Sequence, residues 1–376
     1  MPIDASTWAL STTAAVAVLV VVLAGAPVRW LARRLGAIDV PGGRHQHRCP
    51  TPRLGGLAVL AGVLTALPIG AWQLASLRPE VVEQLPALGV ILLAAVLVAL
   101  LGAVDDCRSI SPVAKLLGLA AAGAVLIAGG VQIDVVELPW LGKLPLGPFA
   151  AIATILWVLA CSNAVNLIDG VDGLGSGVAL VACAALALVA HGLGDTTSTL
   201  AFVGIAAACA GFLVHNREPA RLFLGDSGSL LLGFLLAALS ANGCTKRTTA
   251  VLLVAATCTL AVPLLDSTQA FVRRFRRAAR DGSARFAQRL RATAVGDREH
   301  IHHRLLVRGM SHRQVARTLS LCAAVPATTA LLLLPTGEVG ALSIAGAVLA
   351  SACVLWRLAA LRAPAATPTP RTDRQP

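Results

Sequence analysis

Charged side chains are scarce in this chain. Asp, Glu, Lys and Arg make up 13% of its 376 residues, whereas 56% of the residues are hydrophobic. A soluble domain carries roughly 25% charged residues, so the composition argues against a soluble helical protein. Apolar runs of about 17–25 residues, long enough to cross a bilayer as helices, recur from end to end. We therefore predict an all-α polytopic membrane protein whose backbone polar groups are bonded within each helix.

Other absences narrow the possibilities further. No CxxC pair occurs among the nine cysteines, most of which lie in apolar runs, so we interpret them as small buried residues. No basic residue precedes the first apolar run, which argues against a secretory signal peptide and for a retained first span. The net charge of +12 does not indicate a nucleic-acid partner, because Lys and Arg of membrane proteins gather in cytoplasmic loops.

The apolar runs predict about eleven membrane spans. They cover residues 7–26, 56–74, 85–104, 113–129, 148–168, 175–192, 197–214, 227–241, 248–266, 317–336 and 339–361. We expect one transmembrane domain over 1–362 and a disordered cytoplasmic tail over 363–376. The stretch 130–147, rich in Pro and Gly, predicts an external loop or a short hairpin.

Charge asymmetry orients this domain. Alternation places five loops on one side, at 27–55, 105–112, 169–174, 215–226 and 267–316. All but four of the 31 Lys and Arg residues lie on that side or within a turn of it. The positive-inside rule makes that side cytoplasmic and the N-terminus external.

The polar clusters fall on the same side, although each one has an ordinary explanation. Asp105 and Asp106 could form a hydrated helix end, and the segment NAVNLIDGVDGL, with Asp169 and Asp172, could be a solvated turn. Asp226, just before a helix in LFLGDSGS, suits an N-cap and a metal ligand about equally. Because all of these clusters share one face, we predict a single site there. Carboxylates beside groups suited to phosphate favour Mg²⁺, which prefers oxygen ligands.

The long loop 267–316 contains REHIHHRLL. A zinc site is disfavoured because HExxH spacing is absent and no Cys is near. The three His could be solvated, or could donate hydrogen bonds to phosphate or sugar hydroxyls. The Arg-rich remainder could lie on anionic headgroups as an amphipathic stretch or could cover a polyanionic substrate.

Five motifs together carry a family resemblance. DVPGGRHQHRCPTPRLGG matches DxPxxRxxHxxPxPRxGG, DDCRSISPVAK matches DDxxxLSPxxK with Ile110 at the usual Leu, and NAVNLIDGVDGL matches NxxNxxDGxDGL. HNREPARLFLGDSGS matches NxxPAxxFxGDxGS, and PLLDSTQAFVRR with REHIHHRLL resembles PxxDxxxxxxRR and HxHHRLL. From Asp39 to Arg313 the chain thus resembles the polyprenyl-phosphate N-acetylhexosamine-1-phosphate transferases, of the glycosyltransferase family 4 type.

The resemblance implies an Mg²⁺-dependent enzyme of the bacterial plasma membrane, with Mn²⁺ as an alternative metal. It would transfer HexNAc-1-phosphate, with GlcNAc-1-phosphate the first choice, from a UDP-sugar to undecaprenyl or decaprenyl phosphate. UMP would leave, and a lipid-linked cell-envelope glycan would be started. A homodimer is compatible with this interpretation. The residues that the resemblance assigns are Asp105, Asp106, Asp169 and Asp172 as catalytic, Asp226 and Asp106 as metal ligands, and Lys115, Asn163, Asn166, Asn216, His300, His302, His303 and Arg304 as substrate-binding.

Two alternatives remain open. The phospho-MurNAc-pentapeptide transferase of peptidoglycan synthesis is a related enzyme, but its histidine element usually reads HHH, whereas this chain has HIHHRLL. A membrane transporter would place its carboxylates near the midplane of broken or repeated helices. No clear repeat is visible here, and the carboxylates fall at the ends of spans.

Overall fold

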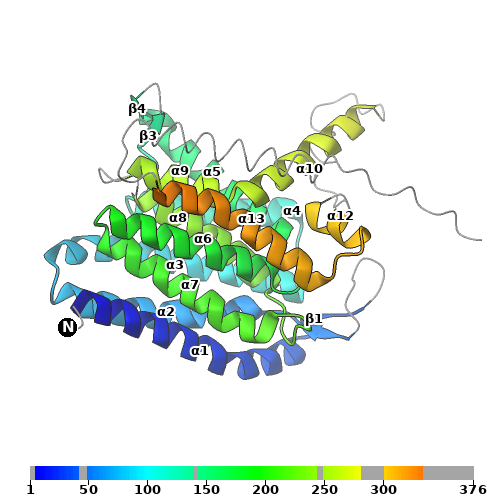
Figure 1. Cartoon of the computed structure of the whole chain (residues 1–376). Coiled ribbons are helices and arrows are strands. Elements are labelled where there is room, and N and C mark those ends of the chain that lie inside the picture. The colour runs from blue at the N-terminus through cyan, green and yellow to red at the C-terminus, as the bar shows by residue number, and fades with distance from the viewer. Residues whose placement is uncertain (1–4, 42–48, 139–141, 244–248, 281–299, 333–376) are drawn as a thin grey trace, which may run out of the picture.

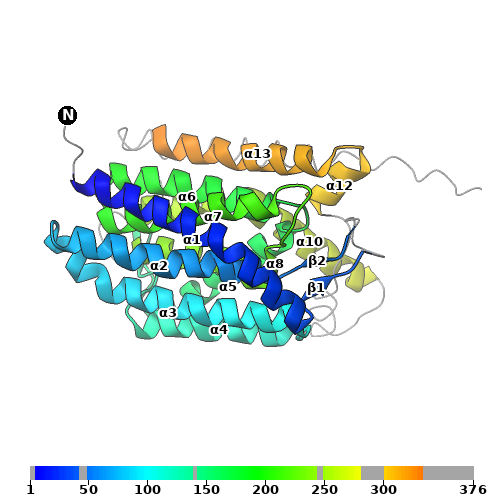
Figure 2. The ribbon, with the colours of Figure 1, turned by 90° about the horizontal axis from the view of Figure 1, so that it is seen from below.

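The computed structural model describes residues 5–41, 49–138, 142–243, 249–280 and 300–332. Its helices run side by side as a bundle (Figures 1 and 2). The helices are α1 (Ala5–Leu35), α2 (Gly55–Ala75), α3 (Pro79–Cys107), α4 (Pro112–Ala128), η1 (Gly147–Phe149), α5 (Ala150–Ile168), α6 (Leu174–Gly192), α7 (Thr196–Asn216), α8 (Gly225–Gly243), α9 (Thr249–Thr259), α10 (Ala261–Arg280), α12 (Ile301–Val307) and α13 (His312–Leu332). The prediction of an all-α polytopic protein is confirmed.

Length and composition make six of the described helices able to cross a membrane: α1, α2, α3, α6, α7, and α5 together with η1. The apolar helix α4 is shorter, at 17 residues. The predicted span 317–336 begins inside α13, whereas 339–361 and the tail lie outside the described residues. Cys161, Cys183 and Cys209 are buried, as their apolar runs predict.

Helix α8 forms the centre of the bundle. Its apolar side chains from Leu230 to Leu239 are almost wholly inaccessible to solvent, because α2, α3, α5 and α9 pack around it. Small residues permit the closest approaches. A side chain at Gly102 of α3 would collide with the backbone of Asp226 and Ser227. The first turn of α8 is therefore pressed against the last turns of α3.

The predicted span 248–266 is divided between two helices. Helix α9 ends at Thr259 and α10 begins at Ala261. Leu260 and Leu264 still donate backbone hydrogen bonds four residues back, but Pro263 has no N–H to offer the Thr259 carbonyl. The chain turns at this point, and α10 leaves the bundle (Figure 1).

The predicted loops also contain more helix than expected. Helix α1 continues to Leu35, and Asp105 and Asp106 lie in the last turn of α3 rather than after it. Within 267–316, α10 extends to Arg280, and α12 and the start of α13 follow. The helices therefore extend further into the predicted loops than the sequence indicated.

Two short hairpins lie at opposite ends of the bundle (Figures 1 and 2). Strands β3 (Val135–Leu138) and β4 (Gly142–Pro145) pair antiparallel, which confirms the predicted hairpin within 130–147. At the other end, β1 (Ile38–Asp39) pairs antiparallel with β2 (Thr51–Pro52). The start of α1 lies at the end away from β1, β2 and α12 (Figure 2).

Candidate functional site

A pocket of about 330 Å³ opens at the bundle end that carries β1, β2 and α12. Segments from six parts of the chain meet there. The lining residues are Asp39, Arg53, Asp106, Asn166, Asp169, Gly170, Val171, Asp172, Asn216, Phe223, Leu224, Gly225, Asp226, Ser229, His303, Leu306 and His312. The polar clusters that the sequence placed on one face therefore do share one site.

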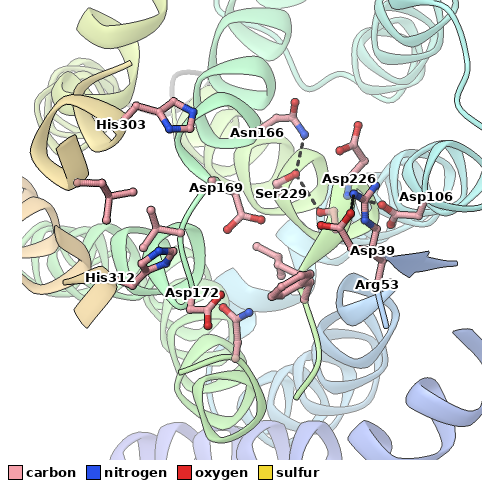
Figure 3. A pocket seen from close by; sticks show the side chains of 17 residues that line it. Asp39, Arg53, Asp106, Asn166, Asp169, Asp172, Asp226, Ser229, His303 and His312 are labelled. Atoms are coloured by element: carbon pink, nitrogen blue, oxygen red, sulfur yellow. Dashed lines mark hydrogen bonds and ion pairs between the residues drawn. The ribbon is translucent and has the colours of Figure 1, made fainter. Parts of the chain in front are cut away.

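The junction of α3 and α8 builds one wall of the pocket. The Asp106 carboxylate accepts the backbone N–H of Asp226 at 2.9 Å and of Ser227 at 3.0 Å, so it caps the start of α8 from another helix. Gly225 precedes this turn with a φ of +71°, and a Cβ there would collide with the Asp106 carboxylate. The two hydrogen bonds and the close approach at Gly225 place Asp226 in the pocket beside Asp106 (Figure 3).

A lysine joins two carboxylates next to this wall. Lys115 Nζ donates to Asp105 Oδ2 at 2.8 Å and to Asp226 Oδ2 at 2.5 Å. The other Asp105 oxygen accepts the backbone N–H of Ile110 at 2.9 Å, which closes the turn between α3 and α4. Asp105 and Lys115 thus sit directly behind Asp226 and do not line the pocket themselves.

The turn between α5 and α6 forms the pocket floor. Asp169 Oδ1 accepts the Gly175 backbone N–H at 3.2 Å, and Asp172 Oδ2 accepts that of Ala220 at 3.0 Å. Burial, together with the neighbouring Asp226, Asp106 and Asp172 carboxylates, raises the pKa of Asp169 to about 7. Protonation of Asp169 is therefore poised near neutral pH.

Asparagines fix the two helices on either side of this turn. Asn216 Oδ1 accepts the Gly173 backbone N–H at 3.1 Å and the Ser176 hydroxyl at 3.0 Å, which holds the end of α7 against the start of α6. Asn166 Nδ2 donates to Ser229 Oγ at 2.8 Å, which joins α5 to α8 (Figure 3). These contacts hold the pocket floor in place.

The β1–β2 hairpin and α12 close opposite sides (Figure 3). On the hairpin, Arg53 Nη2 lies 2.7 Å from Asp39 Oδ1. On the far side, His303 of α12 and His312 of α13 face the acidic wall. The pocket thus has carboxylates along its floor and one wall, and imidazoles opposite them.

Comparison with known proteins identifies the fold's family. Residues 88–243, from α3 to α8, match the family model described as glycosyl transferase family 4. Over 319 residues the chain is 31% identical to a probable undecaprenyl-phosphate N-acetylglucosaminyl 1-phosphate transferase of Bacillus subtilis, covering 85% of this chain and 83% of that protein. The chain belongs to glycosyl transferase family 4.

Two further relatives in this family come from other bacterial groups. The decaprenyl-phosphate N-acetylglucosaminephosphotransferase of Mycobacterium tuberculosis is 34% identical over 330 residues, 81% of this chain and 78% of that protein. The undecaprenyl-phosphate alpha-N-acetylglucosaminyl 1-phosphate transferase of Escherichia coli is 28% identical over 312 residues, with the same coverage of both chains.

The family 4 site contains only part of the predicted residue set. The predicted residues that line the pocket are Asp106, Asp169, Asp172, Asp226, Asn166, Asn216 and His303. Asn163 points its amide to the Leu159 carbonyl of its own helix at 2.7 Å. His300 and His302 are buried behind the pocket, and Arg304 is likewise absent from its lining.

His302 lies against the pocket floor rather than within the pocket. A Cβ at Gly170 would collide with its ring, and its Nδ1 has no hydrogen-bond partner among the described residues. Burial lowers the pKa of His302 to about 3, with neighbouring His303 contributing, so the ring is neutral at physiological pH. A neutral packed ring supports the floor from behind.

Four pocket residues, Asp39, Arg53, Ser229 and His312, are not among the site residues predicted from the sequence. Asp39 and Arg53 stand in the quoted motif DVPGGRHQHRCPTPRLGG, so a signal was available for them. Ser229 likewise ends the quoted LFLGDSGS. His312, by contrast, lies beyond the histidine motif, and its position in the pocket depends on the turn between α12 and α13.

The donor set of the pocket fits a hard divalent cation. Asp226, Asp169 and Asp172 offer carboxylate oxygens, which Mg²⁺ prefers to nitrogen or sulfur. No group of three His, Cys, Asp or Glu side chains arranged to hold a metal occurs in the described part of the chain. Mg²⁺ commonly binds through one or two carboxylates together with substrate phosphates and water.

Proposed function

We propose that this protein transfers N-acetylglucosamine 1-phosphate from a UDP-sugar to a polyprenyl phosphate at the cytoplasmic face of the bacterial plasma membrane. A phosphate oxygen of the lipid attacks the sugar-bearing phosphorus of the donor. The bond from that phosphorus to UMP breaks, UMP leaves, and a diphosphate links sugar and lipid. The relatives' names supply the acceptor class and the sugar phosphate.

The observation that carries the proposal is the pocket's position and charge. It lies at one end of a bundle of membrane-length helices, where a lipid phosphate and a water-soluble donor can meet. Five Asp side chains line the pocket, against one arginine, Arg53, among the described lining residues. Two phosphate-bearing reactants would be repelled by these carboxylates unless a cation were bound with them.

Mg²⁺ bound at Asp226 would neutralise phosphate charge as it develops in the transition state. The chain's own residues prepare that position. Asp106 fixes the first turn of α8 through two backbone hydrogen bonds, and Lys115 orients the Asp226 carboxylate. The Lys115 ammonium lies behind Asp226, outside the pocket lining, and we assign it to a lipid phosphate that reaches this wall from the turn between α3 and α4.

The opposite wall suits the donor. His303 and His312 can donate hydrogen bonds to diphosphate or sugar oxygens, and Asn166 presents an amide in the same cavity. Asp169, with a pKa near 7, can accept or release a proton at working pH. Phe223 adds an aromatic side chain to the same lining.

The test is a reconstitution. Purified protein in detergent would be mixed with Mg²⁺, undecaprenyl or decaprenyl phosphate, and each of a panel of UDP-sugars, and UMP release would be followed. We expect UMP release that requires both the lipid phosphate and UDP-N-acetylglucosamine, stops in EDTA and returns with Mg²⁺ or Mn²⁺. Release with UDP-MurNAc-pentapeptide alone would favour the peptidoglycan enzyme, and no release with any donor would refute the proposal.

A further inference from the structure

Asp266 of α10 is a buried carboxylate outside the pocket. Its side chain is about 3% exposed, and both of its oxygens contact the segment that begins α12. Oδ2 lies 2.9 Å from Nδ1 of His300, and Oδ1 accepts the backbone N–H of Ile301 at 3.1 Å. Two helices that are remote in sequence are thus joined by one side chain.

Helix α12 needs such a contact. It has seven residues, too few to be stable alone in water. His300 stands at its N-cap position, but the His300 side chain makes no capping hydrogen bond. Asp266 supplies from α10 an acceptor for the backbone N–H of Ile301, one of the N–H groups at the start of α12 that has no partner within the helix.

Three imidazoles connect this contact to the pocket. The rings of His300 and His302 are parallel within 5°, with centroids 5.8 Å apart, and the His302 and His303 centroids are 4.2 Å apart. His300 and His302 are buried, whereas His303 lines the pocket. The order is therefore Asp266, His300, His302, His303 and then the cavity.

Packing holds the rest of α12 in register. Ile301 and Leu305 are buried in a small apolar cluster with Val171 and Leu174 of the α5–α6 turn and with Val315 of α13. This cluster restricts the tilt of α12, but apolar contacts are not directional. The hydrogen bonds of Asp266 are directional, and they determine which residue begins the helix.

We infer that Asp266 is a positioning residue for donor binding: by fixing the start of α12, it aims His303 into the pocket and seats His302 behind Gly170. The inference rests on the proposed function for its kinetic readout. Asp266 is absent from the cavity lining, and its hydrogen bonds lead to His300 and Ile301, at the start of the helix that carries His303.

The first experiment compares Asp266→Ala with Asp266→Asn. Alanine removes both acceptors, and we expect the KM for the UDP-sugar to rise by roughly 10-fold or more, with kcat at saturating donor within about 3-fold of wild type. Asparagine keeps the acceptor for the Ile301 N–H, and its amide can donate to His300 Nδ1 after the imidazole proton moves to Nε2. We therefore expect it to restore most of the donor affinity.

Asp195 offers a matched control. It is also a buried, helix-capping Asp, which accepts the Ser198 backbone N–H at 3.0 Å, but it starts α7 at the end opposite Asn216 and the pocket. Asp195→Ala should lower thermal stability while leaving donor KM within about 2-fold of wild type. Equal kinetic effects at Asp195 and Asp266 would overturn the inference.

A double-mutant cycle isolates the route. If Asp266 acts through His303, then Asp266→Ala in a His303→Ala background should not raise donor KM further. If the increase in donor KM of the double variant equals the product of the two single-variant increases, the inference is overturned. His300→Phe keeps a ring in the stack but loses the bond to Asp266, so it tests the same route if Asp266→Ala does not fold.

Hydrogen exchange of the full-length protein gives a readout that needs no activity. Backbone amides of 301–307 should exchange faster in Asp266→Ala than in wild type or in Asp195→Ala. Unchanged exchange there would overturn the inference. A wild-type protein that releases no UMP would instead refute the proposed function, and the exchange result would still decide the role of Asp266.

Discussion

Replacing Asp106 by asparagine tests whether this carboxylate stabilises the fold by capping α8. Both Asp106 oxygens accept backbone N–H groups, from Asp226 at 2.9 Å and Ser227 at 3.0 Å, and the side chain is buried. The asparagine side chain has one oxygen and one NH₂ group. It can keep one of these hydrogen bonds, but its NH₂ then faces the second backbone N–H.

The expected cost follows from that geometry. A buried donor left without a partner costs about 1–3 kcal/mol, so Asp106→Asn should destabilise the protein by about that amount, and Asp106→Ala by about twice as much. Asp226→Asn is the matched control. Its side chain contacts Lys115 rather than backbone. Its neutralisation weakens the ion pair with Lys115 but relieves repulsion from Asp105 and Asp106, so its stability should stay within about 1 kcal/mol of wild type.

Thermal unfolding in detergent, followed by circular dichroism, measures this difference. We expect Asp106→Asn to melt several degrees below wild type, at about 2–4 °C per kcal/mol, and Asp226→Asn to melt close to wild type although it is inactive. Equal melting temperatures for Asp106→Asn and wild type would refute the capping role. A large loss for Asp226→Asn would show that the acidic wall is held together in some other way.

Three further outcomes are expected. If ionised Asp169 is required, the rate should fall as pH decreases through about 7, because burial holds its pKa there, and Asp169→Asn should lose this dependence; a wild-type rate that is flat from pH 6 to 8 would contradict it. Lys115→Met should raise the KM for polyprenyl phosphate by roughly 10-fold while changing donor KM little, and the reverse pattern in acceptor and donor titrations would exclude a role at the acceptor phosphate. In a Cys-depleted background, an impermeant maleimide applied to intact cells should label Leu77→Cys, at the far end of the bundle, but not Val307→Cys beside the pocket; the opposite labelling would invert the proposed orientation.

The gathering of the acidic motifs was predictable from sequence. Asp106, Asp169 and Asp226 each stand where an apolar run begins or ends, and runs that alternate in direction bring such ends to one face. Their detailed contacts were not predictable. That Asp106 caps α8 depends on the close approach permitted by Gly102 and Gly225, which is a tertiary property.

The break between α9 and α10, within the predicted span 248–266, could not be predicted from the sequence. Pro27, Pro68 and Pro86 all lie inside continuous helices, whereas Pro263 coincides with the break between α9 and α10. A proline costs one backbone hydrogen bond in either case, and neighbouring helices decide whether the chain then bends or breaks. Sequence alone therefore could not distinguish Pro263 from the others.

The histidine element was recognisable, but the placement of its members was not. Consecutive residues of a helix point in directions about 100° apart, and in α12 His303 lines the cavity whereas His302 does not. Which one does so depends on where α12 begins, and Asp266, 34 residues earlier in the chain, contacts that point. Asp266 stands in the quoted PLLDSTQAFVRR, but neither that motif nor its spacing from the histidine element indicates that the two side chains meet.

In the proposed reaction a sugar phosphate, rather than a sugar, is transferred to the lipid. Mass spectrometry of the lipid product measures this directly after reaction of the purified protein with UDP-N-acetylglucosamine, Mg²⁺ and undecaprenyl phosphate. We expect a product that carries two phosphates and one N-acetylhexosamine, with one UMP released per product molecule. A lipid with a single phosphate and one sugar, formed with release of UDP, would contradict it.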